Sequence, residues 1–259
     1  MRHRRNAAVA AIAVVCAAPL AVAGVSAGSS AVTGTAPQTA AASAAKDRPP
    51  FIPLPPPSHF QRHVTNRYFP LHVGMRWVYR GFGSEGHERD VVTVMPRTKQ
   101  IVGIRATVVR DIVRSTGKGR RLIERTFDWY AQDGRGRVWY LGENTHAYEG
   151  GHVSTEGSWE TGVHGARAGI IMFRHPRVGV KYWQEFLHGV AEDQGEILDR
   201  GTRAGVPFGH FRHVRMTEDT SPLEPRVAEF KFYARGVGVV LELDASPEQG
   251  RVVLTKFSG

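Results

Sequence analysis

Residues 127–143 read FDWYAQDGRGRVWYLGE, two aromatic, strand-like runs on either side of a Gly-rich turn. This arrangement is a strong short-range signal for a β-hairpin. A turn centred on the middle Gly-Arg pair places Trp129 opposite Tyr140 and Tyr130 opposite Trp139. Because aromatic cross-strand pairs each contribute about 0.2–1 kcal/mol relative to alanine pairs, we expect this hairpin to be a stable local unit.

Both faces of this hairpin carry aromatic or aliphatic residues, so we expect it to be covered on both sides or to line a concave surface. Residues 229–235 show a different pattern. There Phe230 and Phe232 alternate with Lys231 and Tyr233, which predicts a strand with one buried side and one side that faces solvent.

The chain from residue 66 to residue 257 continues in the same way, with turn signals roughly every 8–15 residues between short runs rich in Val, Ile, Thr and aromatic residues. About 190 residues are enough for one hydrophobic core. We therefore expect a single-domain, all-β protein built on a curved antiparallel sheet or half-barrel, with one long Gly-rich loop at 158–179. The predicted strands are residues 75–82, 89–95, 100–114 with a bend at Gly103, 120–132, 137–141, 146–155, 181–187, 191–198, 212–217, 227–235, 239–244 and 251–257.

The amino terminus has the features of a secretory signal peptide, with a basic start, an apolar Ala-rich run and a small-residue cleavage site near Ala27. We expect residues 1–27 to be a cleaved signal. Residues 28–65 are expected to be a disordered linker, first rich in Ala, Ser and Thr and then in Pro, and residues 66–259 to be the antiparallel β domain. An uncleaved anchor is the alternative for the first segment. The single cysteine, Cys16, lies in the signal, so the secreted chain can form no disulfide.

The chain carries 34 Lys and Arg against 24 Asp and Glu, a formal net charge of +10. On a secreted, extracellular protein this balance favours an anionic cell-wall polymer or a membrane surface as partner, and hence association with the cell wall. A solvated basic surface that merely reflects an Arg-rich composition is the simpler alternative. We expect no nucleic-acid partner, because the export signal argues against one.

Two motifs stand out in the globular part, Tyr68-Phe69-Pro70-Leu71-x-x-Gly74-x-x-Trp77 and Asp128-Trp129-Tyr130-Ala131-Gln132-Asp133. Together they resemble a family of uncharacterised bacterial secreted proteins and lipoproteins. The resemblance implies relatives but no activity, and by looser analogy it implies a curved antiparallel sheet akin to the half-barrels of lipoprotein carriers. Common members of that family resemble lipid-anchored proteins. This chain differs, because Val15 precedes Cys16 where a lipidation motif needs a small residue.

No catalytic constellation stands out. The globular part, residues 66–259, lacks the G-x-S-x-G and H-E-x-x-H motifs, and no spacing pairs two of its acids for glycosidase chemistry. The closest histidine pair, His210 and His213, has neither a cysteine nor an acidic residue beside it, whereas a zinc site needs three or four ligands. We therefore expect no catalytic residue, no metal site and no cofactor, and we predict that the protein is not an enzyme.

The aromatic residues of the hairpin and the acids around the Gly-rich loop indicate a binding surface, because rings with a few convergent polar groups hold apolar and carbohydrate ligands. We expect a secreted, non-catalytic protein that binds a small apolar, glycan or cell-envelope ligand in a concave β surface. The alternatives are a glycan-hydrolysing enzyme that uses a pair of these glutamates and a cell-wall interaction module that acts through its basic surface. The candidate ligand-binding residues are Trp139, Tyr140, Glu143, Glu156, Trp159, Glu160 and Glu185.

Overall fold

The computed structural model describes residues 48–259 except 84–85, 118 and 246–249. The expected signal peptide and the Ala-, Ser- and Thr-rich part of the expected linker lie outside the described residues. Within the described part, no helix is long and apolar enough to span a membrane. That part contains one short 3-10 helix, η1 (Pro57–His59), and is otherwise made of strands and the loops between them.

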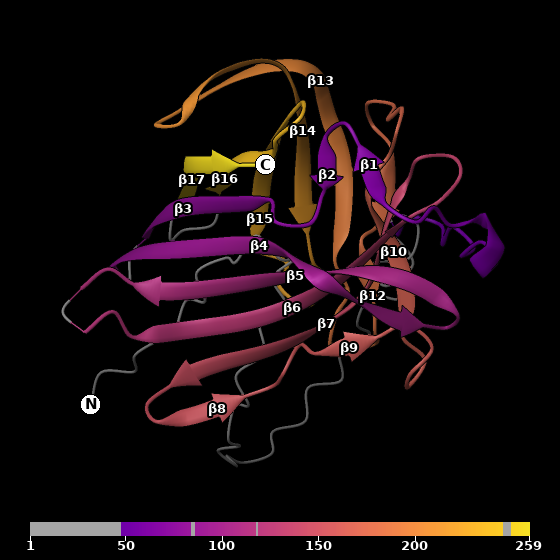
Figure 1. The fold of residues 1–259 in the computed structure, drawn as a ribbon, viewed down its shortest axis with the longest axis horizontal. Coiled ribbons are helices and arrows are strands. Elements are labelled where there is room, and N and C mark those ends of the chain that lie inside the picture. The colour runs from indigo at the N-terminus through magenta and orange to yellow at the C-terminus, as the bar shows by residue number, and fades with distance from the viewer. Residues whose placement is uncertain (1–47, 84–85, 118, 246–249) are drawn as a thin grey trace, which may run out of the picture.

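Within the described residues, fifteen strands form one antiparallel sheet that curves round into a nearly closed barrel (Figure 1). The strand order is β11-β13-β14-β15-β16-β17-β3-β4-β5-β6-β7-β10-β12, β8 and β9 each pair with β7, and β1 and β2 form a separate hairpin. The expected all-β class and curved antiparallel sheet are confirmed. The strands are β1 (Val64–Asn66), β2 (Phe69–Leu71), β3 (Arg76–Gly83), β4 (Gly86–Ile101), β5 (Ile104–Ser115), β6 (Leu122–Gln132), β7 (Val138–Glu149), β8 (His152–Ser154), β9 (Trp159–Glu160), β10 (Arg167–Met172), β11 (Lys181–Trp183), β12 (Glu185–Phe186), β13 (Gln194–Val206), β14 (Gly209–Thr220), β15 (Ala228–Ala234), β16 (Gly238–Asp244) and β17 (Arg251–Ser258).

The two edge strands of the sheet are neighbours in the chain. β11 pairs with β13 at one edge, β12 pairs with β10 at the other, and Gln184 is the one residue between them. The backbone N–H of Gln184 donates to the carbonyl of Asp193 at 2.8 Å. One short segment, residues 181–186, therefore joins both edges of the sheet, which leaves little open edge for pairing with another chain.

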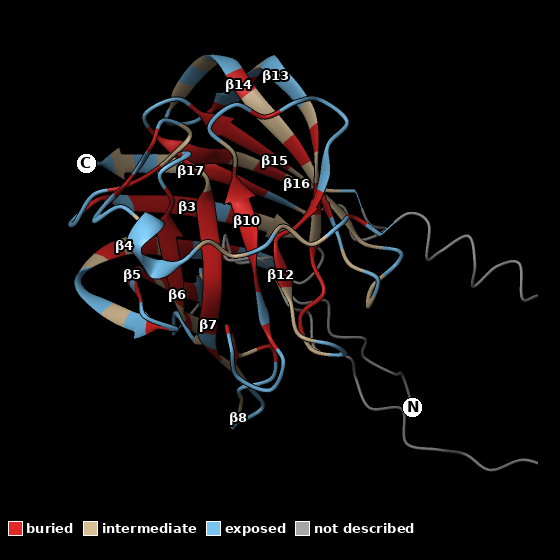
Figure 2. Ribbon diagram, turned by 90° about the vertical axis from the view of Figure 1, so that its right-hand side faces the viewer, coloured by how far each residue is buried: buried red, intermediate tan, exposed pale blue. Residues whose placement is uncertain are grey.

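Apolar residues pack on both faces of the central hairpin, formed by β6 and β7. On one face the rings of Tyr130 and Tyr140 are stacked with their centroids 4.9 Å apart. On the other face Trp129 and Trp139 belong to a second cluster. Figure 2 shows β7 buried over much of its length. The expectation that the hairpin is covered on both sides is confirmed.

The Pro-rich end of the expected linker is a strap that lies on the barrel. The ring of Phe51 stacks on Trp183 at 5.1 Å, and the indole N–H of Trp183 donates to the carbonyl of Pro49 at 2.8 Å. Ile52 and Leu54 pack against the second cluster. Residues 48–60 therefore differ from the expected disordered spacer, because the apolar side chains between the prolines gain burial by lying on the sheet.

The predicted register of the central hairpin is wrong by one residue on one strand. Tyr130 pairs with Tyr140, and a bulge then places Trp129 opposite Gly142. The cause lies in the turn at 133–137. There the carboxylate of Asp133 accepts the backbone N–H groups of Arg135 and Arg137, the Arg137 Nε–H and the indole N–H of Trp139, and so stabilises a longer loop than expected.

Two further predictions are wrong in part. β4 runs on to Ile101, and a tight turn at Val102 and Gly103, both with positive φ, reverses the chain where a bend within one strand was expected. The expected long loop at 158–179 contains β9 and β10, which pair with β7. The run of residues 167–172 alternates little because both of its faces are buried.

Candidate functional site

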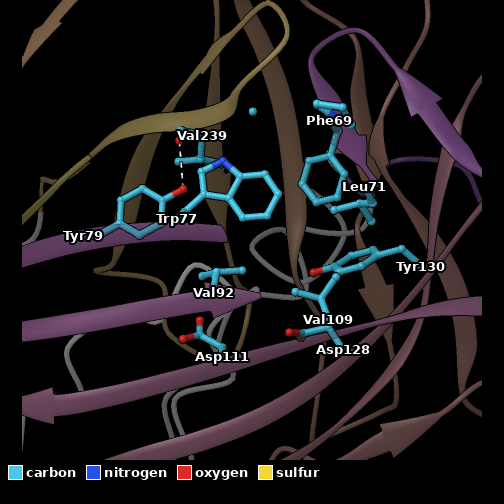
Figure 3. A pocket seen from close by; sticks show the side chains of 12 residues that line it. Phe69, Leu71, Trp77, Tyr79, Val92, Val109, Asp111, Asp128, Tyr130 and Val239 are labelled. Carbon is cyan, nitrogen blue, oxygen red and sulfur yellow. Dashed lines mark hydrogen bonds between the residues drawn. The ribbon is translucent and has the colours of Figure 1, made fainter. Parts of the chain in front are cut away.

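A cavity of ≈ 40 Å³ lies between the concave face of β3–β6 and the β1–β2 hairpin. Most of its wall is aromatic or aliphatic, and the carboxyl groups of Asp111 and Asp128 lie at one end of it (Figure 3). The volume is enough for a few water molecules, because one water needs about 10–15 Å³. The lining residues are Phe69, Pro70, Leu71, Trp77, Tyr79, Val92, Val109, Asp111, Asp128, Tyr130, Gly238 and Val239.

The polar ends of the wall rings are bonded to the backbone of the segment before and within β16. Trp77 donates its indole N–H to the carbonyl of Val237 at 2.7 Å, and the hydroxyl of Tyr79 donates to the carbonyl of Val239 at 2.9 Å. These bonds orient both rings. The cavity therefore meets their apolar parts, and the polar character of the site comes from the two carboxyl groups.

The β1–β2 hairpin, residues 64–71, covers the cavity from one end of the barrel. Its side chains reach the sheet through polar contacts at its rim, where Asn66 Nδ2 donates to the carbonyl of Gly136 at 2.9 Å and the hydroxyl of Tyr68 to the carbonyl of His213 at 3.1 Å. β2 contributes Phe69, whose ring meets Tyr130 edge-on at 5.1 Å. The hairpin thus acts as a plug over the cavity.

Carboxyl groups continue beyond the cavity along the concave face. Strand alternation places Asp90 on β4 and Glu124 and Asp128 on β6 on the same side as the valines of the cavity wall. Asp128 is directly opposite Glu143 of β7, and the hydroxyl of Tyr140 donates to Asp128 Oδ1 at 2.8 Å. The interior of the barrel is therefore acidic as well as aromatic.

Burial governs the protonation of this interior. It is the largest cause that raises the pKa values of Asp90, Asp128 and Glu143 well above their ordinary range, and neighbouring carboxylates raise them further. For Glu124, burial and the charge of Asp111 raise the pKa to about 7, against a lowering effect from the hydrogen bond that Thr126 donates. These carboxyls consequently hold protons at a pH at which exposed acids have lost them.

One buried cation balances part of the acidic charge. Lys231 Nζ lies 3.0 Å from Asp219 Oδ2, 3.4 Å from Glu229 Oε2 and 4.0 Å from Glu242 Oε2. Burial alone would lower the pKa of Lys231, but the three carboxylates raise it well above its ordinary value. The expected solvent-facing side of 229–235 is therefore wrong, because ion pairing allows Lys231 to be buried together with Tyr233.

Four of the seven predicted site residues come together inside the barrel. The rings of Tyr140 and Trp159 meet edge-on at 5.3 Å, and the indole N–H of Trp159 donates to Glu185 Oε2 at 2.7 Å. The charge of Glu185 raises the pKa of Glu143, with burial as the larger cause. Tyr140, Glu143, Trp159 and Glu185 thus form one buried group.

The other three predicted residues lie elsewhere. Trp139 is on the opposite face of the hairpin, where its indole N–H bonds to Asp133. Glu160 pairs with Lys99 at 2.7 Å on the outside of the sheet, and Glu156 is exposed. Successive side chains of a strand point to opposite faces, so neither Trp139 beside Tyr140 nor Glu160 beside Trp159 can join the interior group.

The sequence reasoning missed the acids at the cavity and along β4 to β6. A usable signal was present in β4, where Glu88 and Asp90 stand at the same two-residue spacing as Val92 and Val94. Acids in phase with buried valines indicate a carboxylate on the core face. Within the described residues, no group of three or more His, Cys, Asp and Glu side chains is placed to hold a metal ion.

No family model matches the chain, and no curated protein matches it. Among solved structures, it is similar to a Bacteroides fragilis protein described as exported and as having a YmcC-like fold, with 11% identity and a TM-score of 0.45 over 75% of this chain and 100% of that one. It is also similar to a Parabacteroides distasonis protein described as a lipoprotein, with 13% identity and a TM-score of 0.42 over 76% of this chain and 100% of that one. Similarity at this level carries no argument about function.

Proposed function

We propose that this is a secreted, non-catalytic binding protein whose barrel interior takes a small, mainly apolar ligand that carries a protonated amine. The observation that supports the proposal is the cavity behind the β1–β2 hairpin, which has aromatic and aliphatic walls and the carboxyl groups of Asp111 and Asp128 at one end. Apolar pockets with a few placed polar groups are typical of small-molecule sites. The signal-like amino terminus supports secretion.

The charge inventory favours an amine over a neutral or acidic group. Among the described residues, Lys231 is the single buried Lys or Arg, whereas Asp90, Asp128 and Glu143 are all buried acids with raised pKa values. A cation close to Asp128 would stabilise its ionised form and so gain binding energy. A glycan fits less well, because the cavity wall offers few polar groups to its hydroxyls.

The size of the cavity gives the plug hairpin a role in binding. Ligand pockets usually measure about 300–1,000 Å³, so a ligand larger than a few atoms needs β2 to move outward. The side-chain bonds of Asn66 and Tyr68 hold the hairpin at its rim, while Phe69 covers the cavity. Opening of such a cover before a ligand enters is a common gating step.

A glycan hydrolase remains the alternative of a different class. The interior pair Glu143 and Glu185 interacts electrostatically, and a raised pKa on one member of a carboxyl pair is what a general acid needs. Both side chains are nevertheless buried, with exposures of 4% and 0%, whereas a glycosidase exposes its carboxyl pair in a groove that admits a sugar and water. The burial favours binding over hydrolysis.

Native mass spectrometry of the protein purified from its own host is the first test, because a retained ligand would appear as added mass. Thermal shift with n-hexylamine and n-hexanol then probes the amine. We expect the amine to raise Tm more than the alcohol, and Asp128→Asn to abolish the difference. Glu160→Gln, which neutralises a carboxylate on the outer surface, should keep it. Equal shifts with both probes, or loss of the difference in Glu160→Gln, would contradict an amine site in the cavity.

A further inference from the structure

Strand alternation sorts charge to the two sides of β3–β6. Arg89 lies between Glu88 and Asp90, Arg110 precedes Asp111, and each neighbouring pair points to opposite faces of the sheet. The acids face the barrel interior, so the guanidinium groups face outward. We call these residues the outer arginine face. Its members are Arg76, Arg80, Arg89, Arg110, Arg114 and Arg125.

The strand register gathers these arginines into rows. Arg80 of β3 is directly opposite Arg89 of β4, which is directly opposite Arg114 of β5. Neighbouring strands are about 4.8 Å apart, so the three side chains leave the sheet within about 10 Å of one another. A second row runs from Arg76 through Thr93 to Arg110. Like charges placed directly opposite repel, so such a row is costly unless an anion covers it.

The outer arginine face has no acidic partner of its own. In the described part of the chain, none of its members forms an ion pair with a carboxylate. Arg80, Arg89 and Arg114 are exposed, whereas the Nε atoms of Arg110 and Arg125 are buried. Among the described residues, the one side-chain hydrogen bond of Arg80, Arg89 and Arg114 is a 3.4 Å contact from Arg114 to the carbonyl of Arg120. The guanidinium groups of Arg80, Arg89 and Arg114 are therefore available to an external anion.

We infer that this face binds a linear polyanion with repeated phosphate groups. Guanidinium groups bind phosphate oxygens in pairs, and a row of them fits phosphates that recur along a chain. A bilayer is the less suitable occupant, because none of the exposed large hydrophobic residues lies on β3–β6 to enter a membrane. The inference is independent of the interior site, since it concerns the opposite side of the sheet.

Inorganic polyphosphate is the probe for this surface. We expect the wild-type protein to bind it with an affinity that falls as salt rises, because binding releases counterions from the polymer. The triple variant Arg80→Gln, Arg89→Gln, Arg114→Gln should bind at least about tenfold more weakly. The slope of log K against log salt concentration should become shallower by roughly 0.7 for each phosphate contact that is lost. Its Tm should be equal or higher, because the substitutions remove repulsion between exposed like charges.

A matched control separates this face from net charge. Arg105, Arg177 and Arg203 are also exposed, but they lie away from the row and none is directly opposite another, so their triple Gln variant has the same net charge as the first. The control should bind polyphosphate within about threefold of wild type, because it loses only the general attraction that comes from net charge. Equal weakening in both variants, no binding by wild type, or binding to phosphatidylglycerol vesicles with none to polyphosphate would each overturn the proposal.

Discussion

Trp159 donates its indole N–H to Glu185 Oε2 across 2.7 Å, with both side chains buried. Trp159 belongs to β9, which pairs with β7, and Glu185 belongs to the edge strand β12. The bond therefore ties the central hairpin to the segment at which the sheet closes. Trp159 and Glu185, two of the predicted site residues, therefore have a structural role, which is compatible with a role in binding.

Replacement of Trp159 by Phe tests the strength of this bond. The variant keeps an aromatic ring but removes the donor to a buried acceptor, so we expect the free energy of unfolding to fall by about 1–3 kcal/mol. Urea unfolding measures the change. A double-mutant cycle with Glu185→Met, which removes the acceptor, should show a coupling energy above about 0.5 kcal/mol. Strictly additive effects would mean that the loss comes from ring packing alone.

The buried cation gives a sharper prediction. Lys231→Met leaves Asp219, Glu229 and Glu242 without their shared counter-charge, and removal of one partner from a buried ionic cluster typically costs about 3–5 kcal/mol. Lys181→Met is the control, because Lys181 Nζ lies 3.6 Å from Glu196 Oε2 at the surface, where such pairs contribute about 1 kcal/mol or less. Urea unfolding measures the free energy of unfolding of both variants. Similar losses in the two would show that burial of the Lys231 cluster does not make its ion pairs more important for stability.

The fold class could be predicted from the sequence because it depends on a local property, the alternation of short β-prone runs with turns. The register of the central hairpin could not. It depends on the four hydrogen bonds that the carboxylate of Asp133 accepts, including one from the indole ring of Trp139, six residues further along the chain. Residues 48–60 differ from the expected disordered linker for a related reason, since their apolar side chains become partly buried only when the finished sheet is there to receive them.

None of the seven candidate residues lines the cavity, and the interior acids were missed because the assumption that charged residues face solvent fails in this barrel. Lys231 and Asp219 are buried together through an ion pair between two strands, and no local pattern in either strand shows that pairing. Tyr140 and Glu143 lie in the interior, whereas Trp139 lies on the other face of the hairpin. Which face is concave is a property of the closed sheet.

The pKa of Glu124 predicts how stability depends on pH. Folding raises this pKa from 4.5 to about 7, so between these values the unfolded chain loses a proton that the folded protein keeps. Rising pH then favours unfolding. The contribution is absent below pH 4.5, grows through the interval and reaches on the order of 3 kcal/mol of destabilisation above pH 7.

Glu124→Gln removes this titration. The variant should lose less stability than wild type between pH 5 and pH 8 in urea unfolding, because amides do not ionise. Part of the pH dependence of the unfolding free energy should remain, because other buried acids with raised pKa values, such as Asp128, still titrate. Glu156→Gln, at an exposed site, should behave as wild type. If Glu124→Gln reproduced the full pH dependence of wild type, Glu124 would not be the titrating group.

Closure of the barrel depends on a glycine. A Cβ at Gly169 of β10 would collide with the backbone of Gln184 and the carbonyl of Trp183, in the segment that carries both edge strands. Backbone atoms cannot move aside as a side chain can, so Gly169→Ala should lower the free energy of unfolding by about 3 kcal/mol or more. It should also speed hydrogen exchange of the β12 amides, because the edge pairing with β10 is weakened.

Gly209→Ala is the control for this prediction, since a Cβ at Gly209 meets no atom within 4 Å. It should change stability by no more than about 0.5 kcal/mol. Comparing the two variants by urea unfolding and by hydrogen exchange separates the loss of a tight backbone approach from a general glycine effect on the unfolded chain. A Gly169→Ala protein as stable as Gly209→Ala would show that β10 and residues 183–184 approach less closely in solution, and the barrel would then be open along that seam.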